Sequence, residues 1–208
     1  MGDPKTESPE YGHEQRATPQ TWMHRPTDGW TYNQVKELEL PFDWELIDGT
    51  VVPRGVHLGW HDLVRDNLFF SLRSAQAEPF GVGVARWAVF DGLNIPKPDF
   101  IVYDTRGLKG RSLDFPPVEN IVLAVEVVSP TARLDDRYGK HGLYAQAVIP
   151  SYWRVERDEN DLPVVHEFWL HHETGVYAPS PERPVHTGKL VTSVPFPVDI
   201  DLRDLTEA

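Results

Sequence analysis

The stretch I-P-K-P-D-F-I-V-Y at residues 95–103, followed by I-V-L-A-V-E-V-V-S-P at residues 121–130, decides the fold. Each segment contains an apolar strand and one carboxylate. Asp99 precedes the first strand, and Glu126 interrupts the second. A charged side chain within so apolar a strand is costly unless it is paired or holds a metal ion. Glu126 is therefore the strongest single indication of function in the sequence.

The sequence around these segments predicts the order strand, loop, strand, helix, strand over residues 95–153. The apolar run at 121–128 is typical of a strand buried on both faces of a sheet. A helix is expected from Asp135 or Asp136 to about Ala147. The other expected elements are a short helix after Thr31, a hairpin at 44–52 that turns at Asp48-Gly49, a helix at 60–74, and strands at 81–89, 100–103, 151–156, 164–170, 175–177 and within 189–202.

Length and composition indicate one domain. The 208 residues are 40% hydrophobic, with seven Trp, nine Phe and seven Tyr, which is enough for a substantial core. Residues 1–28 are polar and proline-rich and predict a flexible leader, so the domain is expected at 29–208. The chain has no cysteine, no apolar run of membrane-spanning length and no signal-peptide core, which favours a cytoplasmic protein.

The net charge of −12 argues against tight non-specific binding to nucleic acid. No basic stripe is visible in the sequence. Basic residues gather only modestly, in two groups: Lys97, Arg106, Lys109 and Arg111, and Arg133, Arg137 and Lys140. A local basic face beside an acidic remainder is compatible with this pattern.

Four residues form a candidate site: Glu45, Asp99, Glu126 and Lys140. Two carboxylates at the ends of neighbouring strands can share a hard divalent cation, and Mg²⁺ prefers oxygen ligands. Such an ion lowers the pKa of bound water and neutralises charge on a phosphoryl oxygen. A nearby lysine can orient the attacking water and stabilise the transition state. The combination suits hydrolysis of phosphodiester bonds.

The pattern resembles the PD-(D/E)xK nuclease superfamily, in particular its Uma-type branch of restriction-endonuclease-like proteins. The matching pieces, spread over about residues 30–202, are W-E-L-I-D-G at 44–49, a helix opening on His61, P-D at 98–99, A-V-E-V-V-S-P at 124–130, an Asp-rich loop to Lys140, and Y-A-Q-A-V-I-P-S-Y-W-R-V at 144–155. The resemblance implies an α/β fold of restriction-endonuclease type, with a central mixed sheet flanked by helices and an antiparallel hairpin set near each end.

The same resemblance implies a Mg²⁺-dependent deoxyribonuclease, with Mn²⁺ as a substitute. Asp99 and Glu126 would be the metal ligands, with Glu45 supporting the same site, and Lys140 would be catalytic. One feature departs from the superfamily, which places its lysine two residues after the second acid, where this chain has Val128. The Uma-type branch has a lysine on the following helix, where Lys140 lies. A repositioned catalytic lysine and a site that binds metal weakly and cuts nothing both remain open.

Each candidate residue also has a structural alternative. These alternatives are a turn cap for Asp99, an ion pair of Glu126 with Arg86, Arg133 or Arg154, a solvated helix position for Lys140, and a cross-hairpin pair of Glu45 with Arg54. His61 is expected to cap or pack at its helix start, with a supporting role near the site as the alternative. His57 with His61, or His171 with His172, lacks the third ligand of a zinc site. Motifs of serine hydrolases, P-loop NTPases and dinucleotide-binding enzymes are absent.

Two rival functions remain. The first is a catalytically inactive nuclease-fold module that binds a protein or nucleic-acid partner, which the net charge and Val128 favour. The second is an RNA-directed or repair nuclease with the same metal chemistry. Oligomeric state is not encoded in the pattern, and a homodimer is one option because nucleases that cut duplexes often pair.

Overall fold

A seven-stranded mixed sheet forms the centre of the computed structural model, which describes residues 16–55, 59–84, 88–110, 116–128 and 134–207. The strand order is β3-β4-β5-β6-β7-β8, with β9 paired to β7. The strands are β3 (Phe80–Val84), β4 (Phe100–Asp104), β5 (Ile121–Val127), β6 (Ser151–Arg157), β7 (Pro163–His171), β8 (Val176–Pro179) and β9 (Val185–Thr187). Only the β5–β6 pair is parallel among these neighbours. The predicted α/β class with a central mixed sheet is confirmed.

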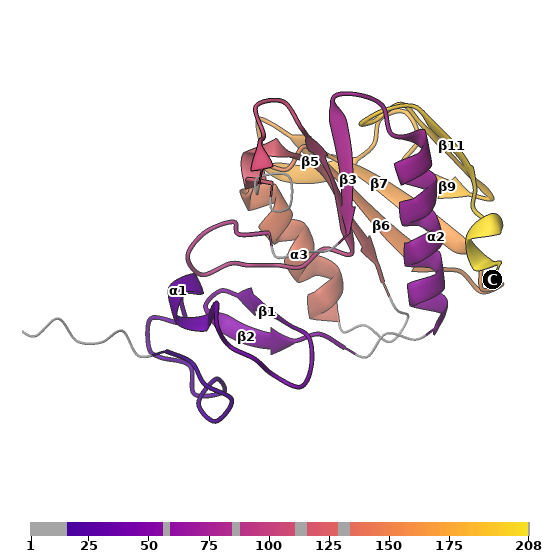
Figure 1. The fold of residues 1–208 in the computed structure, drawn as a ribbon. Coiled ribbons are helices and arrows are strands. Elements are labelled where there is room, and N and C mark those ends of the chain that lie inside the picture. The colour runs from indigo at the N-terminus through magenta and orange to yellow at the C-terminus, as the bar shows by residue number, and fades with distance from the viewer. Residues whose placement is uncertain (1–15, 56–58, 85–87, 111–115, 129–133, 208) are drawn as a thin grey trace, which may run out of the picture.

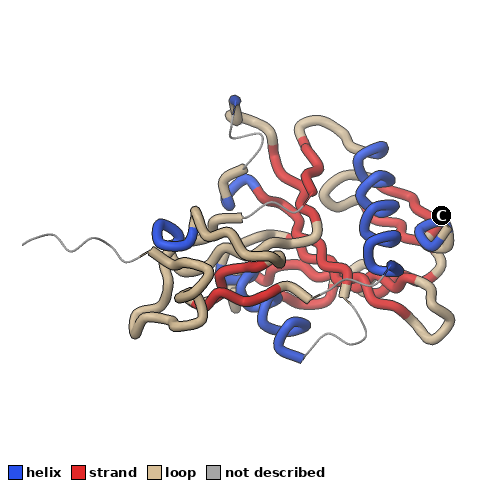
Figure 2. Tube along the Cα trace, turned by 60° about the horizontal axis from the view of Figure 1, so that its bottom comes forward, coloured by secondary structure: helices blue, strands red, loops and turns tan. Residues whose placement is uncertain are grey.

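Helices cover both faces of this sheet, α2 (Gly59–Ala75) on one and α3 (Leu134–Gln146) on the other (Figure 1 and Figure 2). Successive side chains of a strand point to opposite faces. Along β5, Leu123, Val125 and Val127 accordingly belong to the core that includes α2. Ala124 belongs to the core beneath α3. Glu126 follows the same alternation and is directed toward the α3 side.

A separate hairpin brings an early acidic residue to the sheet. Strands β1 (Trp44–Ile47) and β2 (Thr50–Pro53) are antiparallel, as predicted. Asp48 and Gly49 both have positive φ, 47° and 65°, which is the backbone of a two-residue hairpin turn. Leu46 exchanges backbone hydrogen bonds with Ile95, at 3.3 Å and 2.7 Å. The hairpin is therefore fixed to the segment that leads into β4.

The N-terminal part packs onto this hairpin. Helix α1 (Tyr32–Val35) begins after Thr31, as predicted, and the Thr31 N–H donates to the Gln34 side chain at 2.8 Å. Ahead of it, the Ala17 N–H donates to the Gln34 carbonyl at 3.0 Å, and Ala17 is buried. Residues 16–28 thus contact the hairpin layer, while the flexibility of residues 1–28 stays a prediction.

The C-terminal end contains more strands than the sequence predicted. The tail forms two antiparallel strands, β10 (Lys189–Thr192) and β11 (Val198–Asp201), because the P-F-P segment turns the chain between them. The three-residue strand β9 was not predicted. The strand expected at 81–89 ends at Val84, with residues 85–87 outside the described part and Ala88 bonded to Pro96 away from the sheet.

The described residues also include two short 3-10 helices, η2 (Val118–Asn120) and η3 (Asp204–Thr206). Within the described ranges, no helix has the length and apolar character needed to cross a membrane.

Candidate active site

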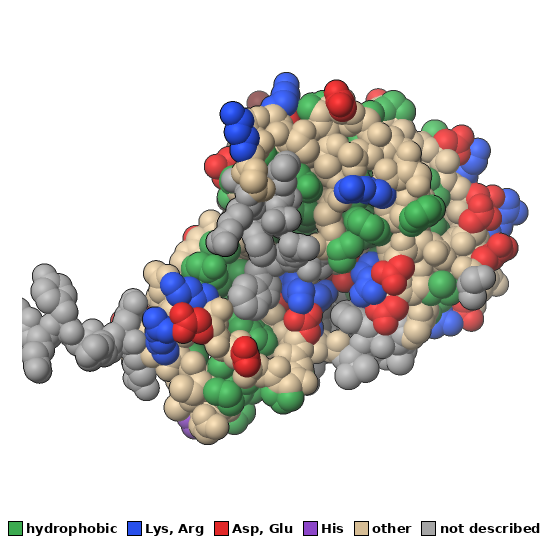
Figure 3. All heavy atoms as spheres, viewed as in Figure 1, with side chains coloured by type: hydrophobic (Ala, Val, Ile, Leu, Met, Phe, Trp, Pro, Cys, Tyr) green, Lys and Arg blue, Asp and Glu red, His purple; other side chains and the backbone are tan. Residues whose placement is uncertain are grey.

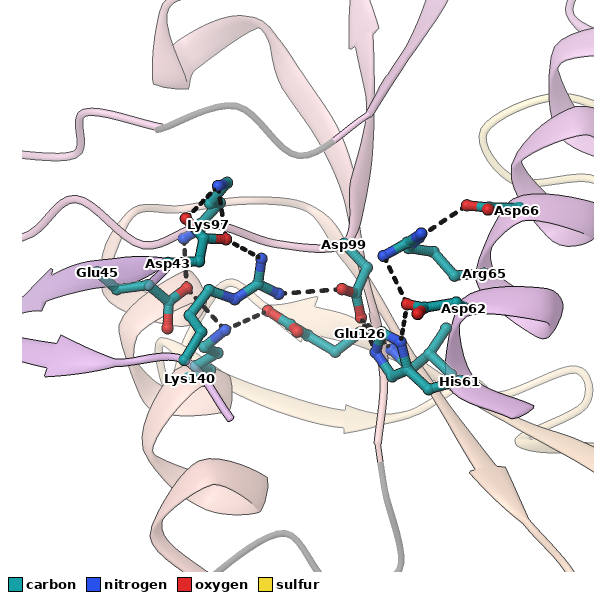
Figure 4. Close-up of polar contacts among 12 residues, drawn as sticks. Asp43, Glu45, His61, Asp62, Arg65, Asp66, Lys97, Asp99, Glu126 and Lys140 are labelled. Atoms are coloured by element: carbon teal, nitrogen blue, oxygen red, sulfur yellow. Dashed lines mark hydrogen bonds and ion pairs between the residues drawn. The ribbon is translucent and has the colours of Figure 1, made fainter. Parts of the chain in front are cut away.

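Asp99 and Glu126 lie next to each other at one end of the central sheet (Figure 4). Asp99 directly precedes β4, whose first residue, Phe100, pairs with Val125 of β5. The register therefore brings the residue before Phe100 to the level of the residue after Val125. Both carboxylates are buried, with Asp99 only 1% exposed and Glu126 7% exposed. Asp99 and Glu126, which the sequence predicted as a pair, are therefore neighbours in the structure.

Three donors hold the Asp99 carboxylate. Arg54 Nη2 donates to Oδ1 at 3.0 Å, the Val127 N–H donates to Oδ2 at 2.8 Å, and His61 Nε2 lies 3.3 Å from Oδ2. Burial raises the pKa of Asp99, but the contacts with His61, Arg54 and the Val127 amide outweigh it and lower that pKa to about 2. Burial likewise opposes a charge on His61, yet Asp99 and Asp62 raise the pKa of its imidazole. Asp99 is therefore ionised throughout the neutral range.

Helix α3 supplies two donors to Glu126. Lys140 and Tyr144 are four residues apart and so project from one face of the helix. Lys140 Nζ lies 3.1 Å from Glu126 Oε1, and the Tyr144 hydroxyl donates to the same oxygen. Burial raises the pKa of Glu126 to about 7, with the charges of Asp99 and Glu45 adding to the rise and Lys140 and Tyr144 opposing it.

Glu45 of β1 reaches the same place because its hairpin is fixed to the 95–97 segment. Its Oε1 accepts the Lys97 backbone N–H at 2.5 Å and lies 2.8 Å from Lys140 Nζ. Burial disfavours a charge on Lys140, but Glu126 and Glu45 outweigh it and raise the pKa of the amine. Figure 4 shows Lys140 between the two glutamates. The structure thus brings together all four residues that the sequence singled out: Glu45, Asp99, Glu126 and Lys140.

Most of the structural alternatives differ from what is observed. Lys140 is not solvated, since its side chain is 15% exposed and ion-paired. Among the described residues, no ion pair joins Glu126 to Arg154, whose Nε lies 3.0 Å from Glu156. Arg86 and Arg133, the other partners considered for Glu126, lie outside the described residues, as does His57.

The contacts that Arg54 and Tyr144 make in the site were not predicted. Arg54, expected opposite Glu45, instead pairs with Asp99 at 3.0 Å and Asp43 at 3.4 Å. No local signal indicates this pairing, because Arg54 and Asp99 are 45 positions apart. The Tyr144 hydroxyl on Glu126 could have been found from its spacing of four residues after Lys140. His61 is buried at the start of α2 and contacts Asp99, which is the supporting position considered for it.

The ligand atoms of the site suit a hard divalent cation, but positively charged side chains already pair with them. Glu45, Asp99 and Glu126 offer carboxylate oxygens from three separate elements, the ligand type that Mg²⁺ prefers. Over the described ranges, no group of three or more His, Cys, Asp or Glu side chains is disposed to hold a metal ion. Arg54 is bonded to Asp99, and Lys140 is bonded to both glutamates. The site therefore contains the carboxylate oxygens that a metal ion would need, and each carboxylate is paired with an arginine or lysine side chain.

The raised pKa of Glu126 predicts how stability changes with pH in the absence of metal. A carboxyl whose pKa is about 7 in the folded protein, against a usual 4.5, stabilises the fold below pH 4.5 and loses that contribution as pH rises through 7. Glu126→Gln cannot titrate there. From pH 5 to 8 in EDTA, the free energy of unfolding of the wild type should fall by about 2 kcal/mol relative to Glu126→Gln.

Urea unfolding at each pH measures this difference. Glu119→Gln is the control, because Glu119 is exposed on η2. The free energy of unfolding of this variant should change with pH as that of the wild type does. Parallel curves for the wild type and Glu126→Gln over the same range would contradict the prediction.

A mixed sheet flanked by helices, with buried acids and a lysine at one end, defines an α/β protein with one acidic, lysine-containing candidate site. Residues 31–188 match the Uma2 family, described as "Putative restriction endonuclease", and the chain belongs to this family. The resemblance inferred from the sequence is confirmed. No curated protein matches the chain.

The fold is also found among solved structures. An example is the crystal structure of a "putative nuclease belonging to DUF820" from Anabaena variabilis, with 15% sequence identity and a TM-score of 0.59. The similarity covers 85% of this chain and 97% of that one.

Proposed function

We propose that the protein is a metal-dependent nuclease that hydrolyses phosphodiester bonds in DNA. The observation that carries the proposal is that three buried carboxylates, Glu45, Asp99 and Glu126, lie together, with the Lys140 amine between the two glutamates (Figure 4). Membership of the Uma2 family supports the same class of activity.

Asp99 and Glu126 would hold Mg²⁺, with Mn²⁺ as a substitute, and Glu45 would support them. When bound, the cation would lower the pKa of water and neutralise charge on a phosphoryl oxygen. Asp99 is ready to contribute a full negative charge, because His61 and Arg54 keep its pKa low. Lys140 stays protonated between the glutamates, so its amine can orient water and donate to charge developing on the phosphate.

The face drawn in Figure 3 does not favour tight, sequence-independent binding of DNA. On the face drawn in Figure 3, Lys and Arg side chains are interleaved with Asp and Glu side chains. This mixture agrees with the net charge of −12. Non-specific affinity for DNA comes from neutralising many phosphates, which such a surface does poorly.

The test is cleavage of plasmid DNA by the purified protein in Mg²⁺, in Mn²⁺ and in EDTA, beside Glu126→Ala. We expect cutting by the wild type with either metal, none in EDTA, and none by the variant. Equal cleavage by both proteins would overturn the assignment. A panel of duplex DNA, single-stranded DNA and RNA tests the RNA-directed or repair alternative.

An inactive nuclease-fold module is the second candidate, favoured by Arg54 on Asp99 and by Val128. Val128 is buried at the position where the superfamily has its lysine, and its N–H donates to Val155 in the sheet at 2.8 Å. Calorimetric titration with Mn²⁺ beside the cleavage assay separates the candidates, because an inactive module would bind Mn²⁺ weakly or not at all and would not cut DNA. The homodimer and the cytoplasmic location stay predictions.

A further inference from the structure

Arg54 occupies a central position among the acids of the site. It follows β2, and its backbone N–H donates to the Asp43 carbonyl at 2.8 Å. Its guanidinium bridges two carboxylates, with Nη2 3.0 Å from Asp99 Oδ1 and Nη1 3.4 Å from Asp43 Oδ2. The side chain is only 10% exposed. Burial opposes the charge, but Asp99, Glu126, Glu45 and Asp43 together raise the pKa of Arg54.

A guanidinium cannot be deprotonated in a protein, so Arg54 is a permanent positive charge among these acids. Without it, ionised Asp99 would lie buried with His61 as its nearest cationic side chain, a costly arrangement. Asp99 Oδ2 already accepts the Val127 N–H and lies against His61, so Oδ1, the oxygen that Arg54 holds, is the one left for a metal ion. Arg54 therefore supplies, in the metal-free protein, the charge that a bound cation would supply.

We propose that Arg54 is a displaceable counter-ion, and that a divalent cation reaches Asp99 only by taking the place of the Arg54 guanidinium. The inference rests on the metal site of the proposed function. Asp43 provides the alternative partner, because its side chain is 49% exposed and already contacts the other arm of the guanidinium. Lys97 Nζ holds Asp43 in place, at 2.6 Å and 2.7 Å from its two oxygens. Arg54 can thus leave Asp99 without losing every ionic partner.

Competition predicts that removing Arg54 strengthens metal binding. The test is calorimetric titration with Mn²⁺ of the wild type, Arg54→Gln and the control Arg65→Gln. Arg65 pairs with Asp66 at 2.8 Å and Asp62 at 3.0 Å. Burial opposes the charge on Arg65, but these two acids raise its pKa, and the charge of Asp99 adds to the rise, so Arg65 is also close to the site. Both variants lose one positive charge close to the site, and only one loses the contact with Asp99. We expect Mn²⁺ to bind Arg54→Gln about tenfold more tightly and Arg65→Gln within about threefold of the wild type.

Thermal unfolding gives a second readout that does not depend on cleavage. In EDTA, Arg54→Gln should melt below the wild type, because Asp99 has lost its buried partner. Mn²⁺ should raise its Tm by more than it raises that of the wild type, since tighter binding stabilises more. If Arg54→Gln fails to fold, Arg54→Lys replaces it, because lysine keeps the charge but cannot bridge Asp99 and Asp43 with two arms as the guanidinium does. Arg54→Lys should bind Mn²⁺ more tightly than the wild type and less tightly than expected for Arg54→Gln.

If Arg54→Gln binds Mn²⁺ no more tightly than the wild type does, the inference is overturned. If only Arg54→Lys folds, the same result for that variant overturns it. Tighter binding by Arg54→Gln without DNA cleavage by the wild type would retain the inference and refute the nuclease activity. Absence of Mn²⁺ binding in the wild type and both variants would refute the metal site and the inference together.

Discussion

Lys140→Met is expected to slow DNA cleavage by about 100- to 1000-fold while leaving Mn²⁺ binding as tight as in the wild type or tighter. The side chain of Lys140 is buried between Glu45 and Glu126, 2.8 Å and 3.1 Å from their oxygens. Its charge lies beside the acids that would hold the metal ion, so its amine could donate to negative charge developing on a phosphate at that ion. Methionine is similar in length and apolar, so it removes the amine without a large change in volume.

Lys97→Met is the matched control. Lys97 also lies beside Glu45, but it contacts Glu45 through its backbone N–H, and its amine pairs with Asp43. The substitution therefore removes an equal charge nearby and keeps the backbone contact, and cleavage should stay within about threefold of the wild type.

Single-turnover cleavage, Mn²⁺ calorimetry and thermal unfolding in EDTA separate chemistry from binding and folding. A folded Lys140→Met protein that cuts at the wild-type rate would show that the amine serves only to pair two buried glutamates. Slow cleavage with equally weakened Mn²⁺ binding would assign Lys140 to the metal site instead of to the reaction.

Much of the site could be predicted because its residues conflict with their local surroundings. Glu126 interrupts a seven-residue strand of otherwise apolar side chains, so its carboxylate had to have a partner. The strand itself was predictable from the same apolar run. Lys140 could be located only through the resemblance to the Uma-type branch, since a lysine on a helix is ordinarily solvated. The structure places it against Glu126 because α3 crosses between the parallel strands β5 and β6.

The partner of Arg54 could not be predicted in the same way. Hairpin register pairs Trp44 with Pro53, which places Asp43 opposite Arg54 and accounts for that contact, whereas Glu45 lies opposite Val52. The observed partner, Asp99, is set by how the hairpin docks on the 95–97 segment. That docking depends on Leu46 and Ile95, whose contact no periodicity in either segment specifies.

Asp99→Asn should reduce cleavage by about 1000-fold or more. Asparagine has nearly the shape of aspartate and can still accept the Val127 N–H, but it offers a metal ion no charge. Because the pKa of Asp99 is about 2, the wild-type carboxylate is ionised at every working pH, and the loss should not depend on pH from 6 to 9. Plasmid cleavage in Mg²⁺ measures the effect, with Mn²⁺ calorimetry expected to show loss of binding.

Asp43→Asn is the matched control, because Asp43 also pairs with Arg54 but is half-exposed, and its variant should cut within about tenfold of the wild type. Asp99→Asn should also lose about 2 kcal/mol of stability, since Arg54 keeps its charge and loses its buried partner. The double variant with Arg54→Gln should regain part of that stability and none of the activity. A folded Asp99→Asn protein that still cuts within tenfold of the wild type would mean that Asp99 holds Arg54 and His61 in place and takes no part in binding metal.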